Sequence, residues 1–566
     1  MYKILFLVIL IIPCAKVFGQ EIKNLNDWAK ILHMTSDNTK DITDKSFYLT
    51  NGSLIDEIKE FKKIASKEFG QDLVCQFPAR YLLLKETFSN IKNYSLEGCK
   101  QLVRFIKSFK NRYVSLIITS ELLNAPASAF GHVLLLFHEQ EIPEMSSDVI
   151  HFSAIPDKSD NFFTYAYKGL TGKYNGYYLR NKFFEKHHEY SNVEQRYLFS
   201  HRLKISKWQR RRLLLHLFEL RKSKFNYYFI NKNCGFRIGT LLSVVYGKSL
   251  PDNLLYTLPV EIPFIYEKQL DKTVKFSPYS SIAMNYIQKL TKSDEKIFDK
   301  IIKGKKIINS ENFEVLKKAV SYYYIYSFKK NINALPNYKE NLINAKTLFS
   351  NTLKDKIKSP VDKPKPSKLQ IGGGKLNSHH FSTIKIRPFL TDIDMYQENN
   401  LHESELTLLN TSLVKLNNKI FIDELDLLSV KVYAPHSKYF SNLSWQGNLS
   451  INRRNIFQNK GINFNVGLGK SYRFLGLSTF LINLGTDNNH DNYKLYMSPE
   501  INIFIYALSK IKFAVNFKKK IYSEESLDIF ESKLTYLLNK KHDLLIKYNK
   551  NGNFDKRVSL STGYYF

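Results

Sequence analysis

Residues 225–247 read FNYYFINKNCGFRIGTLLSVVYG, and this stretch predicts a strand followed by a helix. The aromatic run Phe225 to Ile230 favours a strand, and Asn231 to Asn233 favour a turn. The apolar periodicity after Cys234 favours a helix that ends near Gly247. Cys234 would then lie in the first helical turn, where free N–H groups and the helix dipole favour a thiolate. A structural, half-buried cysteine explains this stretch alone equally well.

A second stretch, further upstream, supplies a candidate general base. Residues 127–137 read ASAFGHVLLLF, a strand-like run with His132 directly before its apolar part. Attack of a thiolate on an acyl carbon needs an imidazole that takes the thiol proton and returns one to the leaving group. A third polar group would orient that imidazole. His187 and His188 adjoin each other, but no Cys or Asp at ligand spacing completes a metal site, so we expect no metal.

Length and composition indicate a folded chain of several domains. The 566 residues are enough for two to four domains, and 43% of them are hydrophobic. The formal net charge of +32 is spread along the chain as lysine, without a basic block that forms a nucleic-acid motif. This charge suits anionic surfaces such as lipid headgroups or wall polymers, so we expect no nucleic-acid partner. We also expect no cofactor.

The amino terminus predicts export. Residues 1–19 combine Lys3, an apolar core and a small residue before Gln20, which is the pattern of a cleaved signal peptide. The apolar core is too short to span a bilayer well, and no later stretch resembles a transmembrane helix. In an oxidising compartment Cys75 and Cys99 can form a disulfide, which leaves Cys234 as the odd thiol of the mature chain.

The residues between the signal peptide and the carboxyl-terminal third divide into three predicted parts. Residues 20–108 read as a helical domain, and residues 261–353 read as a second helical region. Residues 109–260 predict an α+β domain in which a small antiparallel sheet packs on the helix that starts at Cys234. Its expected strands are Tyr113–Thr119, Val133–Phe137 and Val149–Ile155, and its expected second helix runs from a Ser206 cap through Leu220. A Gly- and Tyr-rich loop at residues 169–176 would line a substrate groove or serve as an ordinary crossover.

Five short motifs in this region occur in one order and carry a family resemblance. They are ASAFGHVLLLF, GLTGKYNG, Glu194-Gln-Arg196, HLFEL at 216–220 and YFINKNC at 228–234. The chain resembles the Lnb N-terminal periplasmic domain family over about residues 22–260, with weaker similarity around Tyr256-Thr-Leu-Pro259. The founding activity of that family is a bacterial lipoprotein N-acyltransferase. The family in turn resembles permuted papain-like (NlpC-type) thiol enzymes, in which the histidine precedes the cysteine.

The resemblance implies roles for individual residues. It implies Cys234 as the nucleophile and His132 as the base. His151 is the favoured orienting group, because permuted enzymes of this type usually take it from the strand after the base. Glu194 and Asn233 are the accessory candidates for the same task.

The composition and the apolar periodicity of the sequence change in residues 354–566. Residues 354–375 contain three prolines and the triplet Gly372 to Gly374, which predicts a linker. From residue 376 the apolar period becomes two, and polar residues occupy the alternate positions, as in residues 462–469. This pattern predicts a transmembrane β-barrel of about twelve strands, by roughly 15 residues per strand and turn. The terminal Phe566 resembles the sorting signal that barrel assembly machinery reads. A soluble β-sandwich is the alternative.

Together these features predict a multidomain α+β protein with a carboxyl-terminal barrel in the Gram-negative outer membrane. Its periplasmic enzyme domain would transfer or hydrolyse acyl groups of a lipid or lipoprotein substrate through Cys234 and His132. A peptidoglycan amidase or peptidase is the alternative enzyme. A non-catalytic envelope binding or assembly protein with a structural Cys234 is the alternative outside enzymes.

Overall fold

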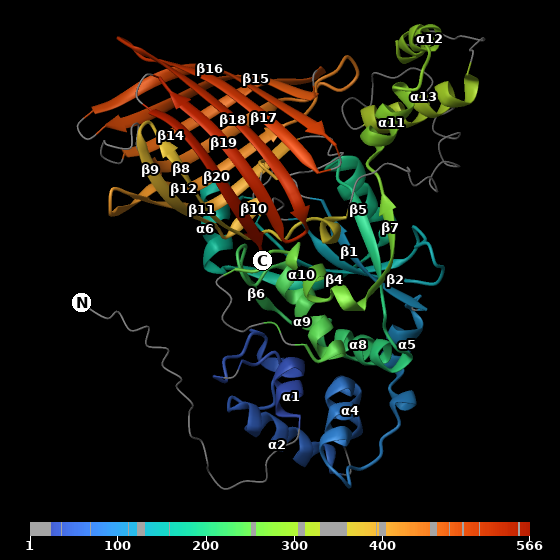
Figure 1. The fold of residues 1–566 in the computed structure, drawn as a ribbon. Coiled ribbons are helices and arrows are strands. Elements are labelled where there is room, and N and C mark those ends of the chain that lie inside the picture. Colours follow the sequence, from blue (N-terminus) through green and yellow to red (C-terminus); the bar gives the residue numbers. More distant parts are fainter. Residues whose placement is uncertain are drawn as a thin grey trace.

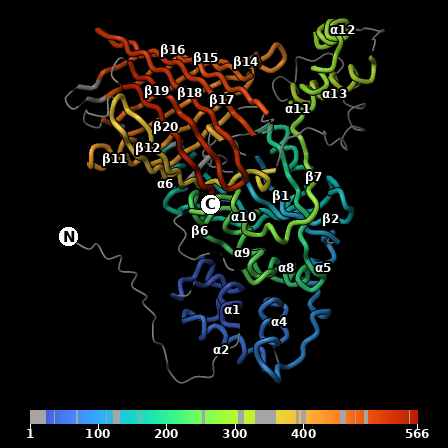
Figure 2. Tube along the Cα trace, viewed as in Figure 1, coloured from blue at the N-terminus to red at the C-terminus, as the bar shows by residue number. Residues whose placement is uncertain are grey.

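The structure is a computed structural model of the chain, shown in Figure 1 and as a trace in Figure 2. It describes residues 24–566 except for 36, 68–69, 111, 121–130, 158, 249, 251–255, 304–311, 329–358, 392, 396–402, 453–460, 475, 490–491, 509 and 553–554. The predicted signal peptide at residues 1–19 lies outside the described residues, and so do residues 127–130 of the motif that precedes His132.

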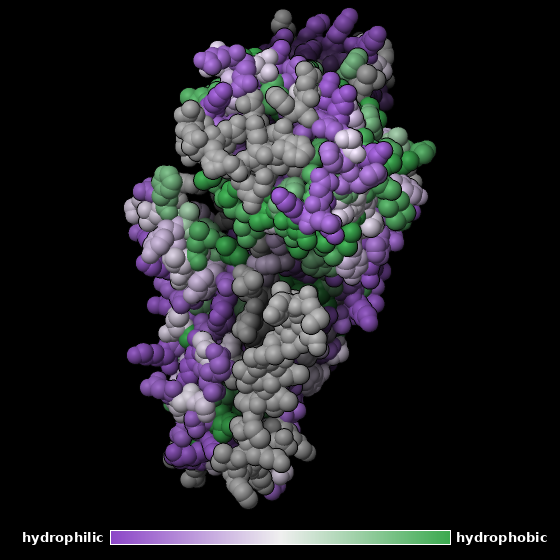
Figure 3. Space-filling view, turned by 60° about the vertical axis from the view of Figure 1, so that its left-hand side comes forward, coloured by the Kyte–Doolittle hydropathy of each residue, from purple (hydrophilic) through white to green (hydrophobic). Residues whose placement is uncertain are grey.

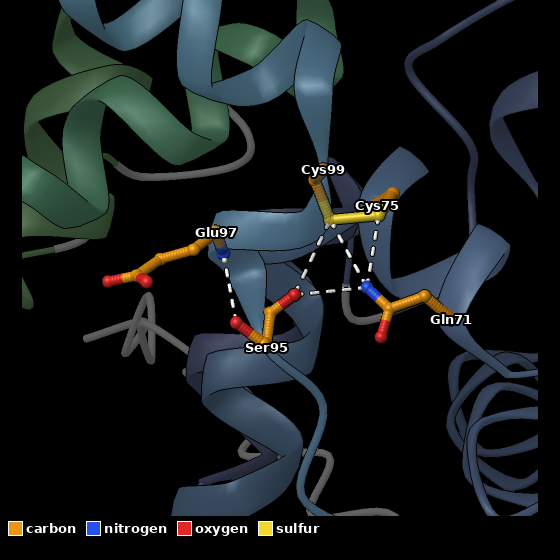
Figure 4. The surroundings of a disulfide bond; sticks show 5 residues. All are labelled: Gln71, Cys75, Ser95, Glu97 and Cys99. Atoms are coloured by element: carbon orange, nitrogen blue, oxygen red, sulfur yellow. Dashed lines mark hydrogen bonds between the residues drawn. A yellow bond between two sulfur atoms is a disulfide. The ribbon is translucent and has the colours of Figure 1, made fainter.

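The N-terminal part is helical, as the sequence predicts. Its α-helices are α1 (Leu25–Leu32), α2 (Leu54–Ala65), α3 (Gln71–Gln76), α4 (Pro78–Thr87) and α5 (Lys100–Lys107). Ser53 begins α2 with a capping box, in which its side chain and that of Asp56 each accept a backbone N–H of the other residue. The predicted disulfide between Cys75 and Cys99 is confirmed, and it joins α3 to the start of α5 (Figure 4).

An antiparallel sheet forms the centre of the next part. Among the described residues it has seven strands in the order β6-β4-β3-β2-β1-β5-β7. Their bounds are β1 (Tyr113–Thr119), β2 (Val133–His138), β3 (Asp148–Ala154), β4 (Tyr174–Lys182), β5 (Leu198–Leu203), β6 (Phe225–Tyr227) and β7 (Leu270–Phe276). All neighbouring pairs run antiparallel.

Both faces of this sheet are covered, which explains why β2 is apolar at nearly every position. Leu135 faces a core shared with α8 (Lys207–Leu220) and α9 (Cys234–Tyr246). Leu136 faces a second core with Phe183 of α7 (Phe183–His187). Successive side chains of a strand point to opposite faces, so a strand between two cores needs apolar residues of both parities. The expected packing of the sheet on the Cys234 helix is confirmed.

The prediction of a loop at residues 169–176 is wrong. The stretch forms the end of helix α6 (Phe162–Thr171) and the start of β4. Gly172 ends α6 with a φ of 74°, in the left-handed region that favours glycine. A Cβ at this position would lie 2.2 Å from the ring of Tyr228, so the glycine also allows a close approach to the Cys234 turn.

The region predicted to be helical at residues 261–353 contains helices and one strand. Its α-helices are α10 (Glu261–Ile265), α11 (Tyr279–Ile287), α12 (Lys292–Ile302) and α13 (Phe313–Phe328). Strand β7 lies between α10 and α11 and adds to the edge of the sheet beside β5. Tyr322 of α13 packs with Tyr279 and Tyr286 of α11. Within the described residues, no helix is long and apolar enough to span a bilayer.

The carboxyl-terminal strands close into a barrel. Their bounds are β8 (Lys368–Leu376), β9 (His379–Arg387), β10 (Phe389–Thr391), β11 (Glu403–Leu416), β12 (Lys419–Tyr433), β13 (Ser444–Asn452), β14 (Gly461–Phe474), β15 (Gly476–Asn489), β16 (Asn492–Ala507), β17 (Ile511–Ile521), β18 (Ser526–Asn539), β19 (His542–Asn551) and β20 (Asp555–Tyr565). Strand β9 pairs with both β8 and β11, so all of these thirteen described strands except the short β10 form one ring. The expected barrel of about twelve strands is confirmed.

The predicted linker at residues 354–375 is too long, because β8 already begins at Lys368. The Gly372–Gly374 triplet lies within this strand, next to β20. A Cβ at Gly374 would lie 1.9 Å from the carbonyl oxygen of Val558, and one at Gly372 would lie 2.5 Å from that of Leu560. These glycines therefore allow close strand contact where the barrel closes, a role that a composition-based linker prediction misses.

The two faces of the barrel strands differ as an outer-membrane barrel requires. Val466 is 41% exposed on the outside, whereas its neighbour Asn465 lines an internal cavity of about 410 Å³. Figure 3 shows hydrophobic side chains concentrated in the upper half of the molecule, where the barrel lies. Ion pairs such as Lys512–Glu403 at 2.6 Å and Lys368–Asp543 at 2.7 Å are buried inside. An apolar outside and a polar inside suit a sheet that is closed in lipid.

Candidate active site

Cys234 and His132 come together from distant parts of the sequence. His132 directly precedes β2, and Cys234 is the first residue of α9, which packs against β2 and β3. The His132 Nδ1 and the Cys234 Sγ are 3.4 Å apart, a hydrogen-bond distance for sulfur. The ring of Tyr190 lies beside the imidazole, with centroids 5.5 Å apart. The predicted nucleophile and base are therefore in direct contact.

Asn233 fixes the start of helix α9. Its Oδ1 accepts hydrogen bonds from the backbone N–H groups of Gly235 and Phe236, which makes it the N-cap of α9. Its Nδ2 donates to the carbonyl of Thr257 at 2.7 Å. A Cβ on Gly235 would lie 2.7 Å from the Cα of Pro259. Residues 256–259 therefore pack directly over the first turn of the helix, and the Asn233 amide holds that turn in place. Its accessory role toward the imidazole stays a prediction.

The protonation of the pair differs from the sequence-based expectation of a thiolate. Cys234 is only 4% exposed, and burial raises the pKa of its thiol to about 11. Hydrogen bonds from the N–H groups of Val133 and Gly235 lower this pKa, but burial outweighs them. Burial and the positive charge of Arg196 lower the pKa of His132 to about 3. The resting pair is therefore a neutral thiol and a neutral imidazole.

His151, the favoured orienting residue, lies on β3 and is held by a different partner. Its Nε2 is 2.8 Å from Oδ1 of Asn181 on the neighbouring β4. Burial lowers the pKa of His151 to about 4, so this imidazole is neutral near pH 7. A positive charge on His151 would lower the pKa of His132, so the two imidazoles are close enough for the charge of one to affect the other. The orienting role of His151 remains a prediction.

Glu194 is connected to His132 through two intermediate side chains. Glu194 pairs with the fully buried Arg196 at 2.8 Å. Arg196 Nη1 donates at 2.9 Å to the hydroxyl of Thr119, and the same oxygen accepts the backbone N–H of His132 at 2.8 Å. This chain of contacts fixes the backbone at His132, and the sequence did not single out Thr119 for it.

Tyr227 is a further residue at the site that sequence reasoning missed. The Tyr227 hydroxyl lies close enough to Cys234 that the two groups shift each other's pKa: burial and the Cys234 charge raise the pKa of Tyr227, and Tyr227 lowers that of the Cys234 thiol. The side chain is buried at the end of β6, immediately before the turn that leads to the nucleophile. The sequence gives no signal for Tyr227, because it lies in a strand-like aromatic run. In such a run, a tyrosine beside a functional thiol has the same pattern as a tyrosine of the core.

The N-terminal domain also reaches the site. Asp41 pairs with Lys232 and, at 2.8 Å, with Arg237, and these two residues lie on either side of Cys234. Burial alone would raise the pKa of Asp41, but the two cations outweigh it and hold this pKa below its ordinary value. Asp41 therefore connects the N-terminal domain to residues on both sides of Cys234. Among the described residues, no group of three or more His, Cys, Asp or Glu side chains is arranged to hold a metal ion.

Family models match three parts of the chain. The Lnb N-terminal periplasmic domain matches residues 101–263, and two domains of unknown function, DUF7843 and DUF7840, match residues 20–87 and 358–565. No curated protein matches the chain.

Solved outer-membrane proteins are similar to the barrel part. The KdgM porin is 11% identical over 35% of this chain and 99% of its own, with a TM-score of 0.21. The NanC porin is also 11% identical over 35% of this chain and 98% of its own, with a TM-score of 0.24. The Acinetobacter baumannii outer membrane protein Omp33 is 8% identical over 36% of this chain and 100% of its own, with a TM-score of 0.23.

The domain match and the closed barrel define the class of the protein. A closed antiparallel ring with apolar side chains outside and ion pairs inside is the structure of an outer-membrane barrel. The part that precedes it matches the model of the Lnb N-terminal periplasmic domain over residues 101–263. The protein is therefore located in the outer membrane and carries a periplasmic domain.

Proposed function

We propose that this protein is a thiol enzyme that transfers or hydrolyses acyl groups through Cys234 and His132. The observation that carries the proposal is the 3.4 Å contact between the His132 Nδ1 and the Cys234 Sγ at the first turn of a helix. Thiol enzymes need this arrangement of a nucleophile and a base within hydrogen-bond reach. The match of residues 101–263 to the Lnb periplasmic domain supports the same reading.

The reaction would begin from the neutral pair. As Sγ attacks the acyl carbonyl carbon, its proton moves to Nδ1 of His132, because the raised thiol pKa disfavours a free thiolate in the buried site. The tetrahedral intermediate then collapses, the bond to the leaving group breaks, and the leaving group takes the proton from His132. An acyl-thioester on Cys234 remains. An amine or a water molecule then attacks this thioester, with His132 again accepting and returning the proton.

Two hydrogen-bond donors near Cys234 would stabilise the negative charge that develops on the carbonyl oxygen. They are the backbone N–H of Cys234 and the hydroxyl of Tyr227, whose pKa responds to Cys234. Donors fixed in a buried site stabilise an oxyanion strongly, because they need no reorganisation during the reaction. We assign this role to both groups.

A lipid or lipoprotein is the substrate class that we propose. The barrel holds the periplasmic domain at the membrane, so an acyl donor or acceptor anchored in the same membrane meets Cys234 without diffusing through the periplasm. Tethering of this kind raises the effective concentration of a membrane-bound substrate. The founding activity of the family that the sequence resembles, N-acylation of lipoproteins, has such substrates.

Comparison of strains tests this proposal. A deletion strain should be complemented with the wild-type chain, Cys234→Ala or Tyr227→Phe, and the acyl groups of phospholipids and lipoprotein amino termini should be measured by mass spectrometry. We expect the wild type alone to restore the full profile, and Tyr227→Phe to restore it partly. Identical lipid and lipoprotein profiles in the deletion, wild-type and Cys234→Ala strains would refute the proposed substrate class. A change in peptidoglycan peptides instead would favour an amidase.

A further inference from the structure

One face of α6 carries three exposed apolar side chains. Phe163, Tyr167 and Leu170 are 81%, 56% and 53% exposed. Their spacing of four and three residues places them along one side of the helix. In the described part of residues 24–328, no other helix exposes three large apolar side chains. Such a concentration on a helix that has a packed opposite side indicates a contact surface.

The opposite side of α6 packs against the turn that leads into the nucleophile helix. The ring of Tyr165 lies 5.0 Å from that of Phe229, and the Phe229 backbone N–H donates to the carbonyl of Gly169 at 2.9 Å. A Cβ on Gly169 would lie 2.2 Å from the Phe229 ring. Helix α6 is therefore tightly packed against residues 228–230, a few positions before Cys234.

The edge of the membrane is marked on the barrel by aromatic residues at its carboxyl terminus. Tyr564 and Phe566 are exposed at the end of β20, with stacked rings whose centroids are 6.1 Å apart. Exposed aromatic side chains at the end of barrel strands lie at the level of the lipid headgroups. This end of the barrel is the one that adjoins the periplasmic domain (Figure 1).

A short series of contacts joins this edge to α6. The backbone N–H of Phe566 donates to the carbonyl of Ser367, and the Ser367 hydroxyl lies 3.3 Å from that of Tyr256. The next residue, Thr257, donates its N–H to the carbonyl of Ile230 at 2.8 Å. Ile230 belongs to the turn on which α6 packs, and Figure 1 shows α6 just below the rim of the barrel. Helix α6 therefore lies on the side of the periplasmic domain that adjoins the rim of the barrel.

The charge beside this face also suits a lipid surface. Lys173 Nζ lies 4.7 Å from the centre of the Tyr167 ring and donates to its hydroxyl at 3.2 Å. A lysine next to exposed aromatic and aliphatic side chains is the composition of helices that lie in the membrane interface, where the cation meets lipid phosphates.

We propose that the α6 face formed by Phe163, Tyr167 and Leu170 inserts into the headgroup region of the periplasmic leaflet of the outer membrane. Its partner is the phospholipid surface. This contact gives the periplasmic domain a second attachment to the membrane, in addition to the barrel, and it places the turn before Cys234 beside the lipid. The inference depends on the barrel and its aromatic edge, and it does not depend on the thiol chemistry.

Spin labelling of the full-length protein tests this placement. Single cysteines replace Phe163, Tyr167 or Leu170 in a Cys234→Ser background, with the Cys75–Cys99 disulfide intact. Each is labelled with a nitroxide and reconstituted in vesicles of phosphatidylethanolamine and phosphatidylglycerol. The matched control is Ile55→Cys on α2, which is also an exposed apolar position at 43% exposure but belongs to the N-terminal domain. Heat-modifiable migration on a gel identifies the variants whose barrel is folded.

The measured quantity is the collision rate of each nitroxide with oxygen, which concentrates in lipid, and with a water-soluble nickel chelate. We expect the oxygen-to-nickel ratio at the three α6 positions to exceed that at residue 55 severalfold. Equal ratios at all four positions would place α6 in water and overturn the proposal. Shielding of the α6 labels from both reagents would show that protein covers this face, and it would overturn the proposal as well. Three separate positions keep the test decisive if one variant does not fold.

Discussion

Replacement of Asp41 by asparagine tests whether the N-terminal domain supports the catalytic turn. The Arg237 side chain is completely buried, and its Nη1 is 2.8 Å from Oδ2 of Asp41. The Asp41→Asn substitution keeps the side-chain volume but removes the negative charge, so Arg237 would remain buried with its charge uncompensated. Breaking a buried ion pair in this way costs about 3–5 kcal/mol. For a domain of this size that corresponds to a decrease in Tm of roughly 6–20 °C.

The assay uses the buried thiol as a reporter. The full-length protein in detergent is heated with a fluorogenic maleimide, which reacts with Cys234 when the domain around it unfolds. Glu141→Gln is the matched control, because Glu141 is exposed on the same domain and pairs with Lys272 and Arg202 at its surface. We expect a clear decrease in the reaction midpoint for Asp41→Asn and little change for the control. Equal midpoints for the two variants would refute the view that Asp41 stabilises this turn.

Three further outcomes follow from burial and charge. Because the pKa of Cys234 is raised to about 11, iodoacetamide should alkylate it at pH 7 at least about 100-fold more slowly than a thiol of ordinary pKa. The alkylation rate should still rise beyond pH 9. An alkylation rate that reaches a plateau below pH 8.5 would contradict the buried resting state. Val466→Asp, on the lipid side, should destabilise the folded barrel by on the order of 1–2 kcal/mol, whereas Asn465→Asp should not. Heat-modifiable migration on a gel measures the folded fraction of each variant, and equal fractions would argue against the assigned faces. Burial lowers the pKa of His187 to about 4, so as pH falls below about 6.5 this histidine takes up a proton in the unfolded state before it does so in the folded state. The free energy of unfolding should therefore be highest above about pH 6.5 and should decrease by roughly 3 kcal/mol toward pH 4. Thermal melting as a function of pH should show a flatter profile in this range for His187→Phe.

Local sequence patterns were sufficient for the elements whose form depends on neighbouring residues. The helix that begins at Cys234 follows from the Asn233 cap and the apolar period after it, and the barrel follows from alternation over many strands. These signals require no knowledge of distant contacts. The number of strands was also predictable, because the length of a membrane-spanning strand is fixed by the bilayer.

Features that depend on tertiary contacts were not predictable. The glycines of residues 372–374 indicate a linker by composition, but their strand conformation depends on close pairing with β20. The raised pKa of Cys234 depends on how deeply the whole domain buries the thiol, which a helix position alone does not determine. Asp41 acts on Arg237 across 196 residues of sequence, and no local pattern marks such a pair.

The central claim, that Cys234 carries an acyl group during turnover, is tested most directly by intact-protein mass spectrometry. The full-length protein and its His132→Ala variant should be reconstituted in phospholipid vesicles with a lipidated acceptor peptide, quenched in acid and analysed. We predict a mass increase of one acyl chain on the wild type, located on the peptide that contains Cys234 and removed by hydroxylamine, and no increase on His132→Ala. An unmodified Cys234 in wild-type protein that consumes the acyl donor would contradict the account.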